Sequence, residues 1–175
     1  MIRRHESGGT VSEADFSGCG RYRYALTRLW QPDAPRLLWI MLNPSTASEL
    51  RNDPTVARCE SRARGMGFGA FRVVNLFAFR ATDPRELRRA AAPKGPRNDT
   101  TIAAGAVWAD VVLCAWGGHG IWQGRGDEAE ATLRRAGHAL WHLGLTATGH
   151  PRHPLYLPSN TLPQVWHPPG GPGGD

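Results

Sequence analysis

Short apolar runs alternate with polar stretches along most of the chain. Runs bounded by turn-forming residues are typical of buried strands, and they lie at 37–42, 71–77, 110–116 and 138–143. The stretch 21–30 alternates charged and apolar residues, which predicts a half-buried strand. Caps and amphipathic spacing between these runs predict helices at 54–64, 86–92, 98–108 and 127–136.

Strands that alternate with helices favour an α/β fold. We expect a three-layer sandwich with a mostly parallel central sheet. The length of 175 residues suggests one domain, which we place at 21–166. The polar residues 1–20 predict a mobile N-terminal segment, and the Pro- and Gly-rich residues 167–175 predict a disordered tail.

The chain is basic, with a formal net charge of +6 and a pI of about 10. Arginine supplies nearly all of the positive charge, since Lys94 is the single lysine. Guanidinium groups suit phosphate recognition, so a nucleic-acid partner is one interpretation. The arginine bias of a GC-rich genome is the other, and both stay open.

Several classes of protein are disfavoured by what the sequence lacks. No apolar run is long enough to span a bilayer and no signal peptide is present, so we expect a cytoplasmic protein without a membrane partner. The 3 cysteines predict neither a disulfide framework nor a zinc site. No phosphate-binding loop, dinucleotide fingerprint or serine-hydrolase elbow occurs. His150 and His153 lack a nearby third ligand, so we expect neither metal nor cofactor.

Polar or aromatic residues follow the predicted strands where each one ends. In a parallel sheet these ends meet at one edge, where α/β folds bind ligands. The residues concerned are Asn43, Asn75, Trp116 and the histidines of the 150–153 loop. Asn43 either caps a turn or faces a crevice, and Asp53 either caps a helix or takes part in catalysis.

Four motifs in this order resemble the uracil-DNA glycosylase superfamily. They are Met41-Leu42-Asn43-Pro44, Val73-Val74-Asn75, Leu113-Cys114-Ala115-Trp116-Gly117 and His153-Pro154-Leu155. Members of that superfamily have a three-layer α/β fold with a parallel sheet. They hydrolyse the N-glycosidic bond of a base that has been flipped out of DNA, and they use no metal or cofactor.

The resemblance implies roles for individual residues. Asn43 would position the attacking water, Asn75 would read the base edge, and His153 would stabilise the departing base, with Asp53 as a further catalytic candidate. The base pocket would also include Phe77, Phe79, Pro44, Ser45 and Trp116. DNA contacts would come from Arg80, Arg152, Leu155, Tyr156 and His150. Met41 replaces the glycine usual before this asparagine, and His150 competes with His153 for the histidine role.

The chain as a whole also resembles a bacterial family known only as a domain of unknown function. Its hallmarks here are LNPSTA, DPT, NLFAFRATDP, AWG and HPLYL, within 21–157. We therefore expect a monomeric DNA glycosylase of base excision repair that removes a uracil-type or otherwise modified base from single- or double-stranded DNA. Two alternatives are a binding module without hydrolysis and an enzyme that acts on free nucleosides or nucleotides.

Overall fold

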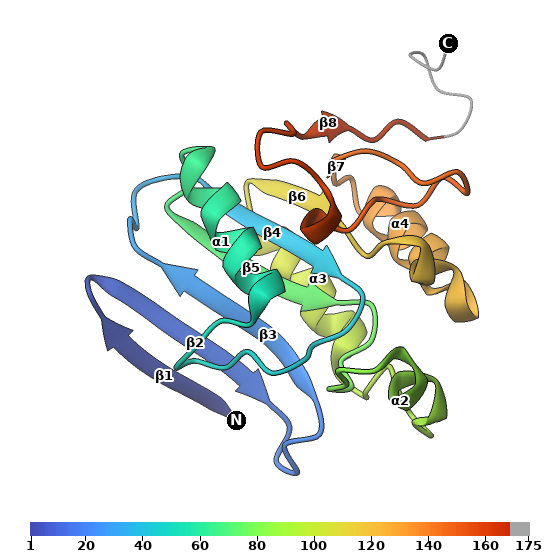
Figure 1. Ribbon diagram of the computed structural model, residues 1–175, viewed down its shortest axis with the longest axis horizontal. Coiled ribbons are helices and arrows are strands. Elements are labelled where there is room, and N and C mark those ends of the chain that lie inside the picture. The colour runs from blue at the N-terminus through green and yellow to red at the C-terminus, as the bar shows by residue number, and fades with distance from the viewer. Residues whose placement is uncertain (169–175) are drawn as a thin grey trace.

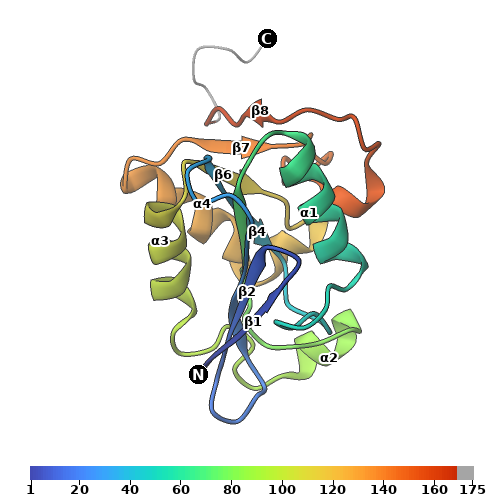
Figure 2. The ribbon, with the colours of Figure 1, turned by 90° about the vertical axis from the view of Figure 1, so that its left-hand side faces the viewer.

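The computed structural model describes residues 1–168 and forms one sheet with helices on both faces (Figures 1 and 2). The strands are β1 Ile2–Ser7, β2 Thr10–Phe16, β3 Arg23–Leu29, β4 Arg36–Met41, β5 Ala70–Asn75, β6 Val111–Cys114, β7 Leu140–His142 and β8 Gln164–Val165. The α-helices are α1 Pro54–Gly65, α2 Pro84–Arg89, α3 Asn98–Trp108 and α4 Arg125–Arg135. Two 3-10 segments, η1 Gly118–Gly124 and η2 Pro154–Tyr156, complete the set.

The sheet is mixed, which corrects the expectation of a mostly parallel one. Its strand order is β1-β2-β3-β5-β4-β6-β7-β8. Three neighbouring pairs, β5 with β4, β4 with β6 and β6 with β7, are parallel, whereas the other four pairs are antiparallel. The alternation of strands and helices correctly indicated the parallel centre. Two of the antiparallel pairs, β1 with β2 and β2 with β3, join strands that are consecutive in the chain and connected by short turns.

The N-terminal residues, for which we predicted a mobile segment, form a hairpin of two strands. Residues Ile2 to Ser7 pair with Asp15 to Thr10, and β2 in turn pairs with β3 in antiparallel orientation. Both faces of β1 are exposed, and the inward positions of β2 are Ser12, Ala14 and Phe16. These small or polar inward residues gave no apolar alternation from which a strand could be predicted. Most of the expected disordered tail lies outside the described residues.

Two apolar clusters hold the layers together, one on each face of the sheet. The first joins Leu38, Ile40 and Val74 of the sheet to Ile102 of α3 and Leu133 of α4. The second joins Leu37, Trp39 and Phe71 to Val56 and Cys59 of α1. Helix α1 therefore covers one face while α3 and α4 cover the other, as Figure 2 shows edge-on.

The parallel centre brings the carboxyl ends of β4, β5 and β6 to one edge of the sheet. Met41 and Asn75 are register partners, so Asn43 and Asn75 leave the sheet side by side. Leu76 N–H and Phe77 N–H continue the pairing by donating to the carbonyls of Met41 and Leu42. Asp53 caps α1 as predicted and Pro54 is its first residue, which starts the helix beside this edge.

Candidate functional site

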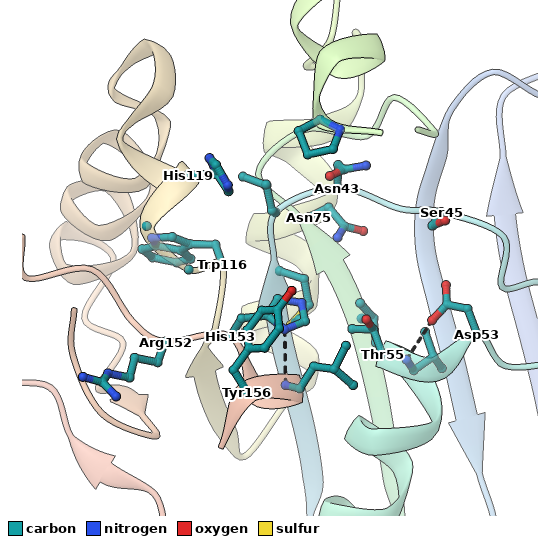
Figure 3. Close-up of a pocket in the computed structure, with 18 of the residues that line it drawn as sticks. Asn43, Ser45, Asp53, Thr55, Asn75, Trp116, His119, Arg152, His153 and Tyr156 are labelled. Carbon is teal, nitrogen blue, oxygen red and sulfur yellow. Dashed lines mark hydrogen bonds between the residues drawn. The ribbon is translucent and has the colours of Figure 1, made fainter. Parts of the chain in front are cut away.

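A cavity of about 690 Å³ opens at this edge (Figure 3). It lies between the ends of β4, β5 and β6, the start of α1, and the segments η1 and η2. The predicted site residues that line it are Asn43, Ser45, Asp53, Asn75, Trp116, Arg152, His153, Leu155 and Tyr156. Residues from four separated motifs thus share one cavity.

Asn75 is the last residue of β5, and its side chain is a buried amide without a protein partner. The residue is 2% exposed, and its Oδ1 makes no hydrogen bond within the described residues. Its backbone carbonyl accepts a hydrogen bond from Asn98 Nδ2 at 2.8 Å, which fixes the strand end. A buried amide ordinarily finds partners, so this unpartnered oxygen in a residue that lines the cavity makes Asn75 a candidate for ligand recognition.

Asn43 anchors the loop after β4 through its amide nitrogen. Asn43 Nδ2 donates to the Ala81 carbonyl at 2.8 Å and to the Pro44 carbonyl at 3.1 Å. Ala81 N–H donates back to the Pro44 carbonyl at 2.9 Å. Asn43 therefore does cap a turn, and Oδ1 remains as the acceptor that it can offer a water. Pro44 itself is buried and bounds the site only through this loop.

His153 is a neutral imidazole with a defined tautomer. Its Nδ1 accepts a hydrogen bond from Leu155 N–H at 3.2 Å. Burial lowers the pKa of His153 below its usual 6.5, although the nearby Asp53 charge acts in the opposite direction. The ring is thus neutral at pH 7, and its proton lies on Nε2 because Nδ1 is an acceptor. His153 contributes one donor to the cavity.

His150, predicted as a DNA contact and as the alternative to His153, does not line the cavity. It is buried, and its Nδ1 accepts a hydrogen bond from Trp116 Nε1 at 3.3 Å. This bond orients the Trp116 ring at the cavity wall. Gly117, which follows Trp116 with a φ of 75°, donates its N–H to the Pro151 carbonyl at 2.7 Å. The Trp-Gly motif thereby holds the histidine loop beside the strand ends.

Asp53 caps α1 and also lines the cavity. Its Oδ1 accepts from Val56 N–H at 2.9 Å, and its Oδ2 accepts from Ala47 N–H at 3.3 Å. Each carboxylate oxygen keeps a second lone pair. The capping role is thus established, and the carboxylate charge still acts on the cavity, as its influence on His153 indicates.

Arg23 is a lining residue that the sequence did not reveal. It is 2% exposed, and its Nη1 donates to the Ala47 carbonyl at 2.8 Å. Burial lowers the pKa of Arg23 to about 10, while the charge of Asp53 opposes this shift. An arginine in an alternating strand ordinarily faces water, so the pattern carried no signal for it. His119 and Thr55 also line the cavity without having been predicted.

Two predicted aromatic residues lie outside the cavity. Phe77 is 0% exposed and packs in the core against Trp122, with 4.7 Å between ring centroids, so it cannot stack on a base. Phe79 and Arg80 line a neighbouring cleft instead. The chain leaves the sheet two residues before Phe77, which turns that side chain inward. Trp116 is the aromatic residue that remains at the cavity wall.

The mouth of the cavity carries an exposed aromatic residue and a cation. Tyr156 is 83% exposed, and its ring centroid lies 5.5 Å from that of His153. Arg152 is exposed, and its Nε donates to the Leu145 carbonyl at 3.0 Å. Leu155 also lines the cavity beside them. These side chains border the opening of the cavity.

Two kinds of feature, a metal-binding cluster and a membrane-spanning helix, are absent from residues 1–168. No group of three or more His, Cys, Asp and Glu side chains is arranged to hold a metal ion there. In the same part of the chain, no helix has the length and apolar character needed to cross a bilayer.

Comparison with known proteins gives one match. Neither the curated proteins nor the solved structures contain a match to this chain. One family profile, described as a protein of unknown function (DUF1643), matches residues 23–155. The match spans β3 to η2 and includes every strand end that contributes to the cavity. The chain therefore belongs to the DUF1643 family, as its LNPSTA and HPLYL motifs indicated.

Proposed function

We propose that this chain is a DNA N-glycosylase, with a uracil-DNA glycosylase-like fold, that acts as a cytoplasmic monomer in base excision repair. The buried, unpartnered amide of Asn75 in a cavity of about 690 Å³ is the observation that carries the proposal. The cavity volume suits a single flipped nucleotide, since small-molecule sites typically range from about 300 to 1,000 Å³. A base inside a duplex has to be flipped out to reach such a site.

Base recognition falls to Asn75. An amide presents a donor and an acceptor side by side, which matches the edge of a uracil-type base. Oδ1 has no partner within the described residues, so a base of matching pattern supplies a hydrogen bond that the fold lacks. Trp116, which is 1% exposed, bounds the base pocket from a buried position and does not offer a ring face for stacking.

His153 assists departure of the base. As the N-glycosidic bond breaks, its electron pair moves onto the base and negative charge collects on the base oxygens. The Nε2–H of neutral His153 donates toward that charge. A positioned donor of this kind typically contributes a factor of about 10² to 10³ in rate.

Asn43 and Asp53 act on the sugar side of the bond. Asn43 Oδ1 accepts a hydrogen bond from the attacking water and orients it, since an amide is too weak a base to remove a proton. The sugar acquires oxocarbenium character as in glycoside hydrolysis. The Asp53 carboxylate stabilises that positive charge and accepts the proton of the water after its oxygen bonds to the anomeric carbon.

A binding module without hydrolysis is the second candidate. Asp53 is the one carboxylate among the residues that line the described cavity, and both of its oxygens already accept backbone N–H groups. This engagement favours a site that reads a modified base and does not cleave it. The two candidates share the role of Asn75 and differ in the chemical step.

A glycosylase screen separates these candidates. The substrates are labelled oligonucleotides with uracil, hydroxymethyluracil, hypoxanthine or mismatched thymine, in single- and double-stranded form. We expect abasic-site formation with at least one base, and its loss in His153→Gln. Base-selective binding without abasic sites would leave the binding module. Absence of both selective binding and cleavage for every base would refute the proposal.

A further inference from the structure

A second cleft adjoins the base cavity. It has a volume of about 310 Å³ and is lined by Arg21, Arg80 and Phe79, with the carboxylate of Glu86 at one side. Ser45, Ala81 and Thr82 line both hollows, so the two are contiguous. The hydroxyls of Ser45 and Thr82 lie 3.1 Å apart at this junction.

The cleft carries two guanidinium groups that no carboxylate neutralises within the described residues. Arg21 is exposed and takes part in none of the ion pairs found there. Arg80 Nη1 donates to the Gly20 carbonyl at 3.1 Å, and its Cζ lies 5.2 Å from the Phe16 ring centroid. These neutral contacts fix Arg80 in place and leave its charge unpaired. The fixed guanidinium of Arg80 and the exposed one of Arg21, beside two hydroxyls, suit a phosphate group.

Phe79 supplies a fixed aromatic surface in the same cleft. Its ring meets Tyr22 edge-on at a centroid distance of 5.9 Å, and Tyr22 stacks on Tyr24 at 6.0 Å. The backbone around it is also held, since Phe79 N–H donates to the Pro93 carbonyl and Arg80 N–H to the Arg21 carbonyl. A rigid, half-exposed ring beside cationic groups is the combination that binds single-stranded nucleic acid.

We propose that this cleft binds the nucleotide next to the flipped one. The connecting phosphate passes over the Ser45 and Thr82 hydroxyls to Arg21 and Arg80, and the neighbouring base stacks on Phe79. The inference rests on the proposed function of the base cavity and narrows its substrate to a polynucleotide. Free nucleosides and mononucleotides would fill only one of the two contiguous hollows.

The test measures binding of fluorescent pentadeoxynucleotides to the full chain. The central residue is 2′-fluoroarabino-uridine, whose fluorine slows N-glycosidic cleavage. The flanking nucleotide on either side is intact, abasic, or joined through an uncharged methylphosphonate. For one of the two sides, we expect the abasic flank and the methylphosphonate each to weaken binding about tenfold.

Variants assign these losses to residues. Phe79→Leu should weaken binding of the intact probe about tenfold and leave binding of the abasic-flank probe unchanged. Arg21→Ala changes an exposed side chain and should weaken binding of the intact probe while leaving binding of the methylphosphonate probe unchanged. Arg135→Ala removes the same charge from α4 outside both hollows and is the control.

The outcomes distinguish this inference from the proposed function. If Phe79→Leu and Arg21→Ala each weakened binding of all probes equally, the flanking-nucleotide cleft would be refuted. Tighter binding of uracil than of thymine at the central position would in that case still support the base cavity. Conversely, flank-dependent effects without any central base preference would keep the cleft and refute the base cavity as a glycosylase site.

Discussion

Two buried asparagines meet at the end of β5 and differ in their hydrogen bonds. Asn98 Nδ2 donates to the carbonyls of Asn75 and Leu76 at 2.8 and 2.9 Å. The Oδ1 atoms of both asparagines are unpartnered within the described residues, and of the two side chains it is Asn75 that lines the cavity. A buried polar group without a partner opposes folding. Retaining one at Asn75 is understandable where a ligand completes its hydrogen bonds.

Replacing each asparagine with leucine separates function from structure. Asn75→Leu removes an unpartnered polar group, so we expect the free energy of unfolding to stay the same or rise, while selective base binding falls at least tenfold. Asn98→Leu removes the donor to the carbonyls of Asn75 and Leu76, of which Leu76 keeps its hydrogen bonds from Arg125, and should destabilise the fold by about 1–3 kcal/mol. Urea unfolding and oligonucleotide binding measure both. Strong destabilisation by Asn75→Leu would make Asn75 a structural residue.

The tautomer of His153 predicts how the rate of base excision depends on pH. Protonation of the neutral ring adds a proton to Nδ1, which then opposes Leu155 N–H and breaks that hydrogen bond. Burial lowers the pKa of His153, so base excision should persist below pH 6.5 and fall only as the pH drops through this lowered pKa. The measurement is the single-turnover rate against pH, beside an NMR titration of the ring.

Asp53 provides the matched change for this titration. Its negative charge favours the protonated imidazole and raises the pKa of His153. Asp53→Asn keeps the size of the helix cap but removes the charge, so the acid limb should move to lower pH. A shift toward higher pH, or none in the NMR titration, would show that Asp53 and His153 do not interact across the cavity.

At the scale of elements, the strands and helices that could be predicted are those with a clear hydrophobic pattern or cap in the sequence. The β4, β5 and β6 runs and the Asp53-Pro54 cap were found because burial and capping leave direct marks in sequence. The hairpin of β1 and β2 was missed, since exposure of both β1 faces removes the alternation. Arg23 was missed for the opposite reason, because its burial contradicts the polar character of arginine. Phe77 was misplaced because β5 ends two residues earlier than predicted.

Two glycines of η1 allow a test of how tightly Trp116 is packed at the cavity wall. A Cβ added at Gly120 would overlap Cδ1 and Nε1 of Trp116, whereas a Cβ at Gly118 meets no atom within 4 Å. Gly120→Ala should therefore displace Trp116 from His150 and cost about 1–3 kcal/mol of stability. Gly118→Ala is the control and should be close to neutral. Equal urea midpoints for both variants would mean that the Trp116 wall is loosely packed.

At the scale of the whole molecule, the parallel centre and the antiparallel flanks have separate consequences. Parallel strands gather Asn43, Asn75 and Trp116 at one edge, which no local pattern could do alone. The turn between the antiparallel strands β2 and β3 adds Arg21, which places the flanking cleft beside the cavity. The cavity and the cleft therefore lie on one continuous surface.

The net charge of +6 predicts that the affinity of that surface for DNA depends on the salt concentration. Binding to DNA releases condensed counterions, so the logarithm of affinity should fall linearly with the logarithm of salt concentration. Arg152 is exposed at the cavity mouth and is expected to contact a phosphate, so Arg152→Ala should flatten this slope by about one unit. Arg135→Ala changes the net charge equally but lies away from the cavity, and its slope should stay near that of the unmodified protein. Affinity that is indifferent to salt would exclude a phosphate interface. Equal slopes for the two variants would mean that charge acts through the molecule as a whole and not through contacts at the mouth.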